Sequence, residues 1–117
     1  MIEPSASRAV ATVKIDNAHV RVTEWRFAPG TATGHHRHEY PYVVVPMTTG
    51  PLSIVAATGE STASLTAGDP YFRPLGVEHD VRNPNASEFV FIEIELKSAG
   101  EIELKSPAAP AAGGATA

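Results

Sequence analysis

The sequence predicts an all-β sandwich or barrel, and three observations support this fold class. Short runs rich in β-branched and aromatic residues recur along the chain, with turn residues between them at regular intervals. No segment shows a long apolar stripe with the 3.6-residue period of a helix. The ten prolines and nine glycines would interrupt such a stripe in any case.

The strands can be placed in chain order. Val10 to Ile15 form the first, Asp16-Asn17-Ala18 form a turn, and His19 to Phe27 form the second, which Pro29-Gly30 ends. Further strands are expected at 42–47, 52–57, 61–66, 71–73, 79–82 and 88–96, with turns rich in Gly, Pro, Asn and Asp between most of them.

The run from Phe89 to Lys97 is the clearest strand, because its residues alternate in character. Its apolar face is predicted to carry Val90, Ile92, Ile94 and Leu96, and its solvated face Glu93, Glu95 and Lys97. Phe89 and Phe91 share the side of the glutamates. We therefore expect this aromatic pair on the outer face, covering a second layer or a subunit contact.

The length of 117 residues is room for one domain. We predict an N-terminal arm at 1–8, one barrel domain at 9–106, and a flexible tail rich in Ala, Pro and Gly at 107–117. The segment 93–98, Glu-Ile-Glu-Leu-Lys-Ser, recurs at 101–106. This repeat is too short for a solenoid. A hairpin, a local duplication and a strand that pairs across a dimer all remain open.

Composition excludes several partners and chemistries. The net charge of −4 and the scattered Lys and Arg argue against nucleic acid, and no apolar run is long enough to span a membrane. The N-terminus shows no secretory signal, so we expect a cytoplasmic protein. Cysteine is absent, which excludes disulfides, thiolate ligands and a cysteine nucleophile.

Two histidine clusters about forty positions apart predict one metal site. His36 and His38 are two residues apart, so on a strand both point to the same side, and His79 can complete the set from another strand. Three imidazoles around an open position suit a divalent transition metal such as Fe, Mn, Ni or Zn. By the same alternation His35 faces away, and His19 is expected to be exposed.

The spacing of these residues resembles the two motifs of the cupin family. The first motif, G-x5-H-x-H-x(3 or 4)-E-x6-G, is matched by Gly30, His36, His38 and Gly50. The second, G-x5-P-x-G-x2-H-x3-N, is matched throughout by Gly68, Pro74, Gly76, His79 and Asn83. The resemblance implies a cupin-type jelly-roll β-barrel, or double-stranded β-helix, with His36, His38 and His79 as metal ligands.

One departure from the first motif bears on function. The glutamate of the motif is replaced by Tyr42 or Val43, depending on the spacing, and Glu39 is too close to His38 to take its place. The chain therefore resembles a three-histidine cupin with positions left for water or substrate. Because the lost carboxylate removes a negative charge, a small anionic substrate is favoured. Three-histidine iron sites in this superfamily belong to dioxygenases of thiols and β-diketones.

A nearer resemblance is to small single-domain cupins named for β-alanine degradation. It covers about three quarters of the chain, including the stretches 25–30, 42–50, 76–79 and 88–97. That name gives no reaction. Small cupins commonly pair their sheets, so a homodimer is expected.

Four side chains are candidates for contacts with the substrate. Tyr40 and Tyr42 have the parity of the histidine pair, so either phenol could act on a bound substrate as donor or acid, although a packed barrel tyrosine is an equal alternative. Arg73 and Arg82 could each bind a carboxylate.

Three functions remain open after this reading. The first is an enzyme that is dioxygenase-like or stabilises an enolate. The second is a non-catalytic module that binds or senses a small molecule. The third is a structural dimer with a vestigial site, which the intact spacing of the three histidines disfavours.

Overall fold

The computed structural model describes residues 8–98, which form nine strands and no helix. Every pairing between these strands is antiparallel. The all-β prediction is thereby confirmed. In this part of the chain no helix could cross a membrane. The strands are β1 (Val10–Asp16), β2 (Val20–Phe27), β3 (His36–Arg37), β4 (Tyr42–Pro46), β5 (Gly50–Ala56), β6 (Gly59–Leu65), β7 (Tyr71–Arg73), β8 (Glu78–Arg82) and β9 (Phe89–Leu96).

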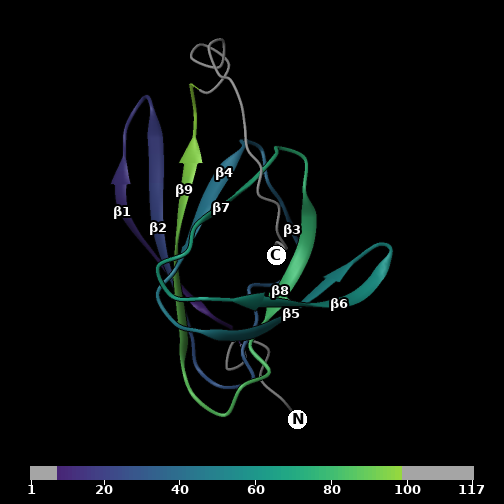
Figure 1. Cartoon of the computed structure of the whole chain (residues 1–117). Helices are drawn as coiled ribbons and strands as arrows, with labels where there is room; N and C mark the ends of the chain where they lie inside the picture. Colours follow the sequence, from purple (N-terminus) through teal and green to yellow (C-terminus); the bar gives the residue numbers. More distant parts are fainter. Residues whose placement is uncertain (1–7, 99–117) are drawn as a thin grey trace.

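The strands form two sheets that face each other (Figure 1). One sheet has the order β1-β2-β9-β4-β7, and the other has the order β3-β8-β5-β6. Alternating side chains from both sheets fill the space between them and exclude water from it. The buried core consists of Phe27, Tyr42, Val44, Leu52, Ile54, Ala63, Leu65, Val81, Phe89 and Phe91.

The predicted strands agree with the structure to within two residues at each end, because turn chemistry sets their limits locally. The turn between β1 and β2 is an example. The Asn17 side-chain oxygen accepts hydrogen bonds from the backbone N–H of His19 at 2.8 Å and of Val20 at 2.9 Å. Such an Asx turn replaces the strand ladder for the residues that reverse the chain.

The predicted faces of β9 were wrong. Phe89, Phe91, Glu93 and Glu95 are the buried residues, while the aliphatic residues between them are only partly buried. The two phenylalanines therefore belong to the core and do not cover a subunit contact. The prediction failed because β9 is apolar on both sides, so alternation alone does not say which side points inward.

The outer face of the five-stranded sheet is strongly apolar instead. The strand register places Phe72, Val43, Ile94, Val22 and Ile15 in one row across the sheet, from β7 to β1. Phe72 and Ile15 are 56% and 48% exposed, and the residues between them are partly buried. We call this row the outer apolar row.

Some sequence predictions lie outside the described residues. These are most of the arm at 1–8, the second copy of the repeat at 101–106, and the tail at 107–117. The first copy of the repeat begins in β9 and ends at Ser98, whose hydroxyl lies 3.3 Å from Nδ1 of His19.

Candidate metal centre

The histidine site is built on the short antiparallel pair of β3 and β8. In this pair His36 lies directly opposite His79. His38 follows β3, and its backbone makes two hydrogen bonds to the turn before β8: its N–H donates to Val77 O and its carbonyl accepts from Gly76 N–H, both at 2.8 Å. Gly76 has a φ of +92°, a conformation that L side chains rarely adopt. The second motif therefore shapes the turn that holds His38 beside His79.

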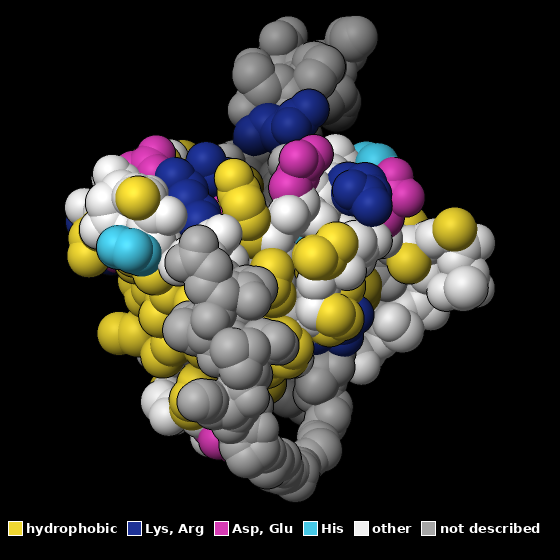
Figure 2. Space-filling view, turned by 90° about the horizontal axis from the view of Figure 1, so that it is seen from above, with side chains coloured by type: hydrophobic (Ala, Val, Ile, Leu, Met, Phe, Trp, Pro, Cys, Tyr) yellow, Lys and Arg dark blue, Asp and Glu magenta, His cyan; other side chains and the backbone are white. Residues whose placement is uncertain are grey.

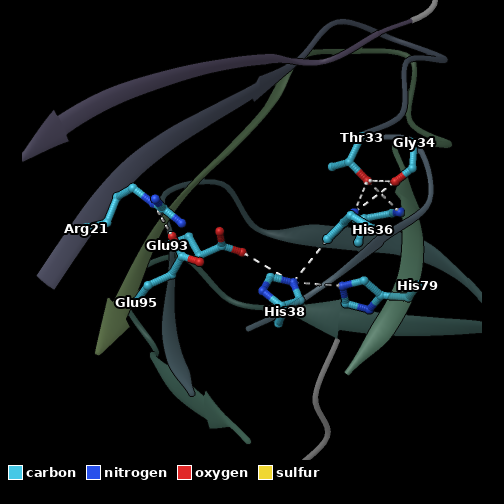
Figure 3. A network of polar contacts seen from close by, with 9 residues as sticks. Arg21, Thr33, Gly34, His36, His38, His79, Glu93 and Glu95 are labelled. Carbon is cyan, nitrogen blue, oxygen red and sulfur yellow. Dashed lines mark hydrogen bonds and ion pairs between the residues drawn. The ribbon is translucent and has the colours of Figure 1, made fainter. Parts of the chain in front are cut away.

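The three imidazoles converge through their Nε2 atoms (Figure 3). Nε2 of His38 lies 3.1 Å from Nε2 of His36 and 3.3 Å from Nε2 of His79. Nitrogens that ligate one metal at ~2.1 Å lie ~3.0 Å apart at a right angle and ~3.4 Å apart at the tetrahedral angle. The spacing of the three nitrogens therefore fits a single transition metal ion.

Two oxygen atoms near Nδ1 fix the tautomer of His36. Its Nδ1 lies 2.8 Å from the carbonyl oxygen of Gly34 and 3.3 Å from the hydroxyl of Thr33. Because a carbonyl only accepts hydrogen bonds, Nδ1 carries the proton and Nε2 keeps its lone pair. A second ring nitrogen held in this way is typical of metal-ligating histidines.

The other two candidate ligands, His38 and His79, stay neutral over a wide pH range. Burial, with help from neighbouring imidazoles, lowers the pKa of His38 to about 3 and that of His79 to about 4. The charge of Arg73 acts in the same direction on both. Neutral imidazole is the form that binds metal, so little competition from protons is expected at neutral pH.

Tyr42 occupies a position of the motif glutamate and stacks on His38, with ring centroids 3.8 Å apart and planes tilted by 17°. Burial raises the pKa of Tyr42 far above its ordinary value, and the negative charge of Glu93 adds to this. The phenol is therefore neutral and is a poor metal ligand. Val43, the other position of the glutamate, belongs to the outer apolar row.

Tyr40 lies elsewhere, although its parity matches that of the histidines. The chain bends at residues 39 and 40, and β4 begins a new strand in the other sheet. The ring of Tyr40 lies beside Arg21, whose guanidinium carbon is 6.0 Å from the ring centroid. Alternation holds only within an unbroken strand, so it does not relate Tyr40 to His38.

Glu93 is the residue that sequence reasoning missed. It points inward from β9, is 8% exposed, and places Oε2 3.8 Å from Nε2 of His38 (Figure 3). With Glu95 it forms a second cluster around His38, apart from His36 and His79. Its parity with Phe89 and Phe91 could have indicated that Glu93 points inward. Glutamates in strands are usually exposed, however, so the sequence reading assigned Glu93 to the solvated face.

The two glutamates of β9 have different partners. Glu95 accepts a hydrogen bond from Nε of Arg21 at 2.7 Å, which balances its charge. Burial raises the pKa of Glu93 to about 7, and the neighbouring charge of Glu95 acts in the same direction, while Trp25 and Arg21 act against it. Glu93 therefore provides a titratable carboxyl group beside the candidate metal ligands.

The remaining candidates lie around the site. His35 is exposed and lies 3.2 Å from Glu78, and Arg82 is exposed and forms an ion pair with Asp80 at 3.0 Å. Arg73 is partly buried, and its charge acts on His38, His79 and Tyr42. Of the two arginines predicted to bind a carboxylate, Arg73 is therefore the one close to the site.

A pocket of about 310 Å³, including its open mouth, adjoins the histidines. Aromatic rings from the five-stranded sheet form much of its wall, and Glu93 reaches it from β9. It is lined by Trp25, Thr33, His36, Tyr42, Val44, Tyr71, His79, Val81, Phe91 and Glu93.

Glu93 is expected to make the stability of the metal-free protein depend on pH. The folded protein keeps the Glu93 proton up to about pH 7, whereas the unfolded chain releases it near 4.5, so stability falls as pH rises between these values. Glu93→Gln should stabilise the protein by roughly 1–3 kcal/mol at pH 8, and the difference should shrink towards pH 5. Urea unfolding in EDTA at both pH values measures this.

Glu95→Gln is the matched control for that measurement. It removes the partner of Arg21, so we expect it to destabilise the protein at pH 8 instead. A gain from Glu93→Gln that is equal at pH 5 and pH 8 would contradict the assignment of a raised pKa to Glu93.

Comparison with known proteins gives consistent results. No family model matches the chain. The chain is 57% identical to the "Beta-alanine degradation protein BauB" of Pseudomonas aeruginosa over 90 residues. These residues make up 77% of this chain and 95% of that protein.

Solved structures show the same fold. A cupin domain from Bordetella pertussis is 60% identical, with a TM-score of 0.76 over 77% of this chain and 94% of that one. An RmlC-like cupin family protein with a double-stranded β-helix fold, from Methanocaldococcus jannaschii, is 12% identical, with a TM-score of 0.65 over 88% and 93% of the two chains. At this low identity the second similarity supports the predicted jelly-roll fold and says nothing about function.

Proposed function

Since the chain belongs to the cupin family, we propose that it binds a divalent transition metal (Fe, Mn, Ni or Zn) through His36, His38 and His79, and that it acts on a small metabolite whose anionic group binds there. The observation that carries this proposal is the convergence of three Nε2 atoms, at 3.1 and 3.3 Å, beside a pocket with an aromatic wall. We also propose that the protein is located in the cytoplasm.

A bound metal would supply Lewis acidity or oxygen activation, in a dioxygenase-like or enolate-stabilising reaction. The side chains around it have separate roles in this proposal. Tyr42 fixes the ring plane of His38 by stacking, and its neutral phenol is a hydrogen-bond donor or acid for the substrate. Glu93 places a titratable carboxyl group within hydrogen-bonding reach of a ligand bound beside His38. The name of the Pseudomonas relative supports a role in the breakdown of β-alanine or a related small metabolite.

A non-catalytic cupin that binds or senses a small molecule is the alternative function. The observation that favours it is the replacement of the motif carboxylate by neutral Tyr42 or by Val43, which points outward. Mass spectrometry of the natively purified protein separates the two functions. A bound metabolite that survives long incubation with metal and oxygen unchanged supports binding alone.

Metal binding is tested on protein stripped with a chelator. We expect one ion of Zn, Ni, Mn or Fe per chain by calorimetry, with a rise in unfolding temperature, because the ion binds only the folded site. If all four ions fail to bind in stoichiometric amounts, the proposal is wrong.

The outer apolar row supports a homodimer that forms through the five-stranded sheet. Figure 2 shows hydrophobic side chains gathered on the flank where β1 and β2 lie in Figure 1. Single exposed apolar residues are common on protein surfaces, but a contiguous apolar row is typical of an interface. A second copy of the chain, related by a two-fold axis, can cover this row.

Ile94→Lys places a charge at the centre of this row and should convert the dimer into a folded monomer. Size-exclusion chromatography with light scattering measures the mass, and circular dichroism checks the fold. Thr62→Lys, on exposed β6, is the control and should stay dimeric. A wild-type protein that is monomeric at every concentration would rule out the dimer.

A further inference from the structure

The segment Thr33-Gly34, which precedes β3, holds the imidazole of His36 (Figure 3). The carbonyl oxygen of Gly34 lies 2.8 Å from Nδ1 of His36, and the hydroxyl of Thr33 donates to the same carbonyl at 2.9 Å. Gly34 has a φ of +88°, a conformation that L side chains rarely adopt. The position of the His36 ring therefore depends on the contacts that keep Gly34 in this conformation.

Strand β8 holds this segment through the two residues that follow His79. The N–H of Thr33 donates to Val81 O at 2.9 Å, and the Thr33 hydroxyl accepts from Val81 N–H at 3.1 Å. The N–H of Gly34 donates to Oδ1 of Asp80 at 3.0 Å. Because a side chain makes this last contact, a substitution can remove it and leave the backbone hydrogen bonds in place.

Asp80 is itself held in a fixed position. Its side chain is 14% exposed, and Oδ2 accepts from Nε of Arg82 at 3.1 Å, so each carboxylate oxygen has a donor. Hydrogen bonds to a charged acceptor are stronger than those between neutral groups. His79 and Asp80 are neighbours in β8, so they face opposite sides of the strand. Asp80 therefore contacts Gly34 from the side of β8 that the His79 imidazole does not face.

We infer that Asp80 is a positioning residue of the metal centre: it holds Gly34, whose carbonyl oxygen fixes the ring plane and the tautomer of His36. This inference rests on the proposed function, in which His36 is a ligand. Strand β8 then supplies one ligand, His79, and positions a second one through the next residue. Groups that orient a metal-ligating histidine typically change metal affinity by roughly 10–100-fold when they are removed.

The first test measures zinc affinity by competition with a chelating dye. Asp80→Ala should weaken zinc binding roughly tenfold, because a His36 ring that can turn must be ordered when the ion binds. Arg82→Ala is the control, since it leaves the carboxylate on Gly34 and should keep the wild-type affinity. Asp80→Asn combined with Arg82→Ala should restore most of the affinity, because the amide oxygen still accepts from Gly34 N–H. A combined variant as weak as Asp80→Ala would assign the effect to charge and overturn the inference.

A double-mutant cycle with His36→Ala separates positioning from a general effect on the fold. Because Asp80 acts through His36 in this inference, Asp80→Ala should cause no further loss of zinc affinity in protein that already lacks the His36 imidazole. An equal loss in the presence and in the absence of His36 would overturn the inference.

A second measurement can be made on the wild-type protein. In the metal-free state, NMR of nitrogen-labelled histidine rings should show the His36 proton on Nδ1, and in Asp80→Ala it should show both tautomers. A wild-type His36 that carries its proton on Nε2 would overturn the inference, even where Asp80→Ala does not fold.

Failure of the inference and failure of the proposed function give different results. Unchanged zinc affinity in Asp80→Ala, with a wild type that binds one ion per chain, overturns the inference and leaves the metal site standing. A wild-type protein that binds no metal overturns the proposed function, and this inference with it.

Discussion

His79→Ala is expected to lower metal affinity by roughly two orders of magnitude or more. His79 is 4% exposed, lies opposite His36 in the β3–β8 pair, and places Nε2 3.3 Å from that of His38. Alanine leaves two imidazoles, whereas substitutions that only disturb the support of a ligand already cost 10–100-fold. Competition against a chelating dye, with zinc and nickel, measures the loss.

His35→Ala is the matched control for this substitution. His35 is next in sequence to a proposed ligand, but it is exposed and faces Glu78. Its removal should leave the affinity and stoichiometry of metal binding unchanged. If His79→Ala binds metal as the wild type does, the assignment of His79 as a ligand is wrong.

Asn83→Ala is expected to reduce the free energy of unfolding by about 2–4 kcal/mol. Asn83 is 1% exposed, and Nδ2 donates to the carbonyl oxygens of Phe27 and Ser87, each at 3.0 Å. Its Oδ1 accepts from the backbone N–H of Asn85 at 2.8 Å. Alanine would remove all three hydrogen bonds, of which the one to Phe27 is buried and the other two are partly buried, and urea unfolding of the metal-free protein measures the cost.

The backbone of Asn83 makes two further hydrogen bonds, which Asn83→Ala would keep. Its carbonyl accepts from Gly30 N–H at 3.0 Å, and its N–H donates to Thr31 O at 2.9 Å, so the end of the second motif is tied to the start of the first. Ser87→Ala is the control, because it keeps the carbonyl that Asn83 uses, and we expect less than about 0.5 kcal/mol. A loss below about 1 kcal/mol for Asn83→Ala would contradict this structural role.

Much of the site was predictable because its signals are local. His36 and His38 point to the same side of a short extended stretch. Pro74 and Gly76 indicate a turn just before His79, which positions that residue. Tyr42, which parity also assigned to the side of the histidines, stacks on His38 by a different route. It comes from β4 in the opposite sheet and meets His38 across the barrel, so the parity that linked it to the histidines was not the physical cause.

The sequence by itself determined where strands begin and end, since alternation and turn chemistry act over a few neighbouring residues. It also determined the histidine set that supports a metal site. Only the tertiary structure decided which face of β9 points inward, because Val90, Ile92 and Ile94 on one side compete with Phe89 and Phe91 on the other. The packing of the whole core selects which of these two faces of β9 is buried. The same choice turns Glu93 towards His38 and leaves the aliphatic side chains on the outer apolar face.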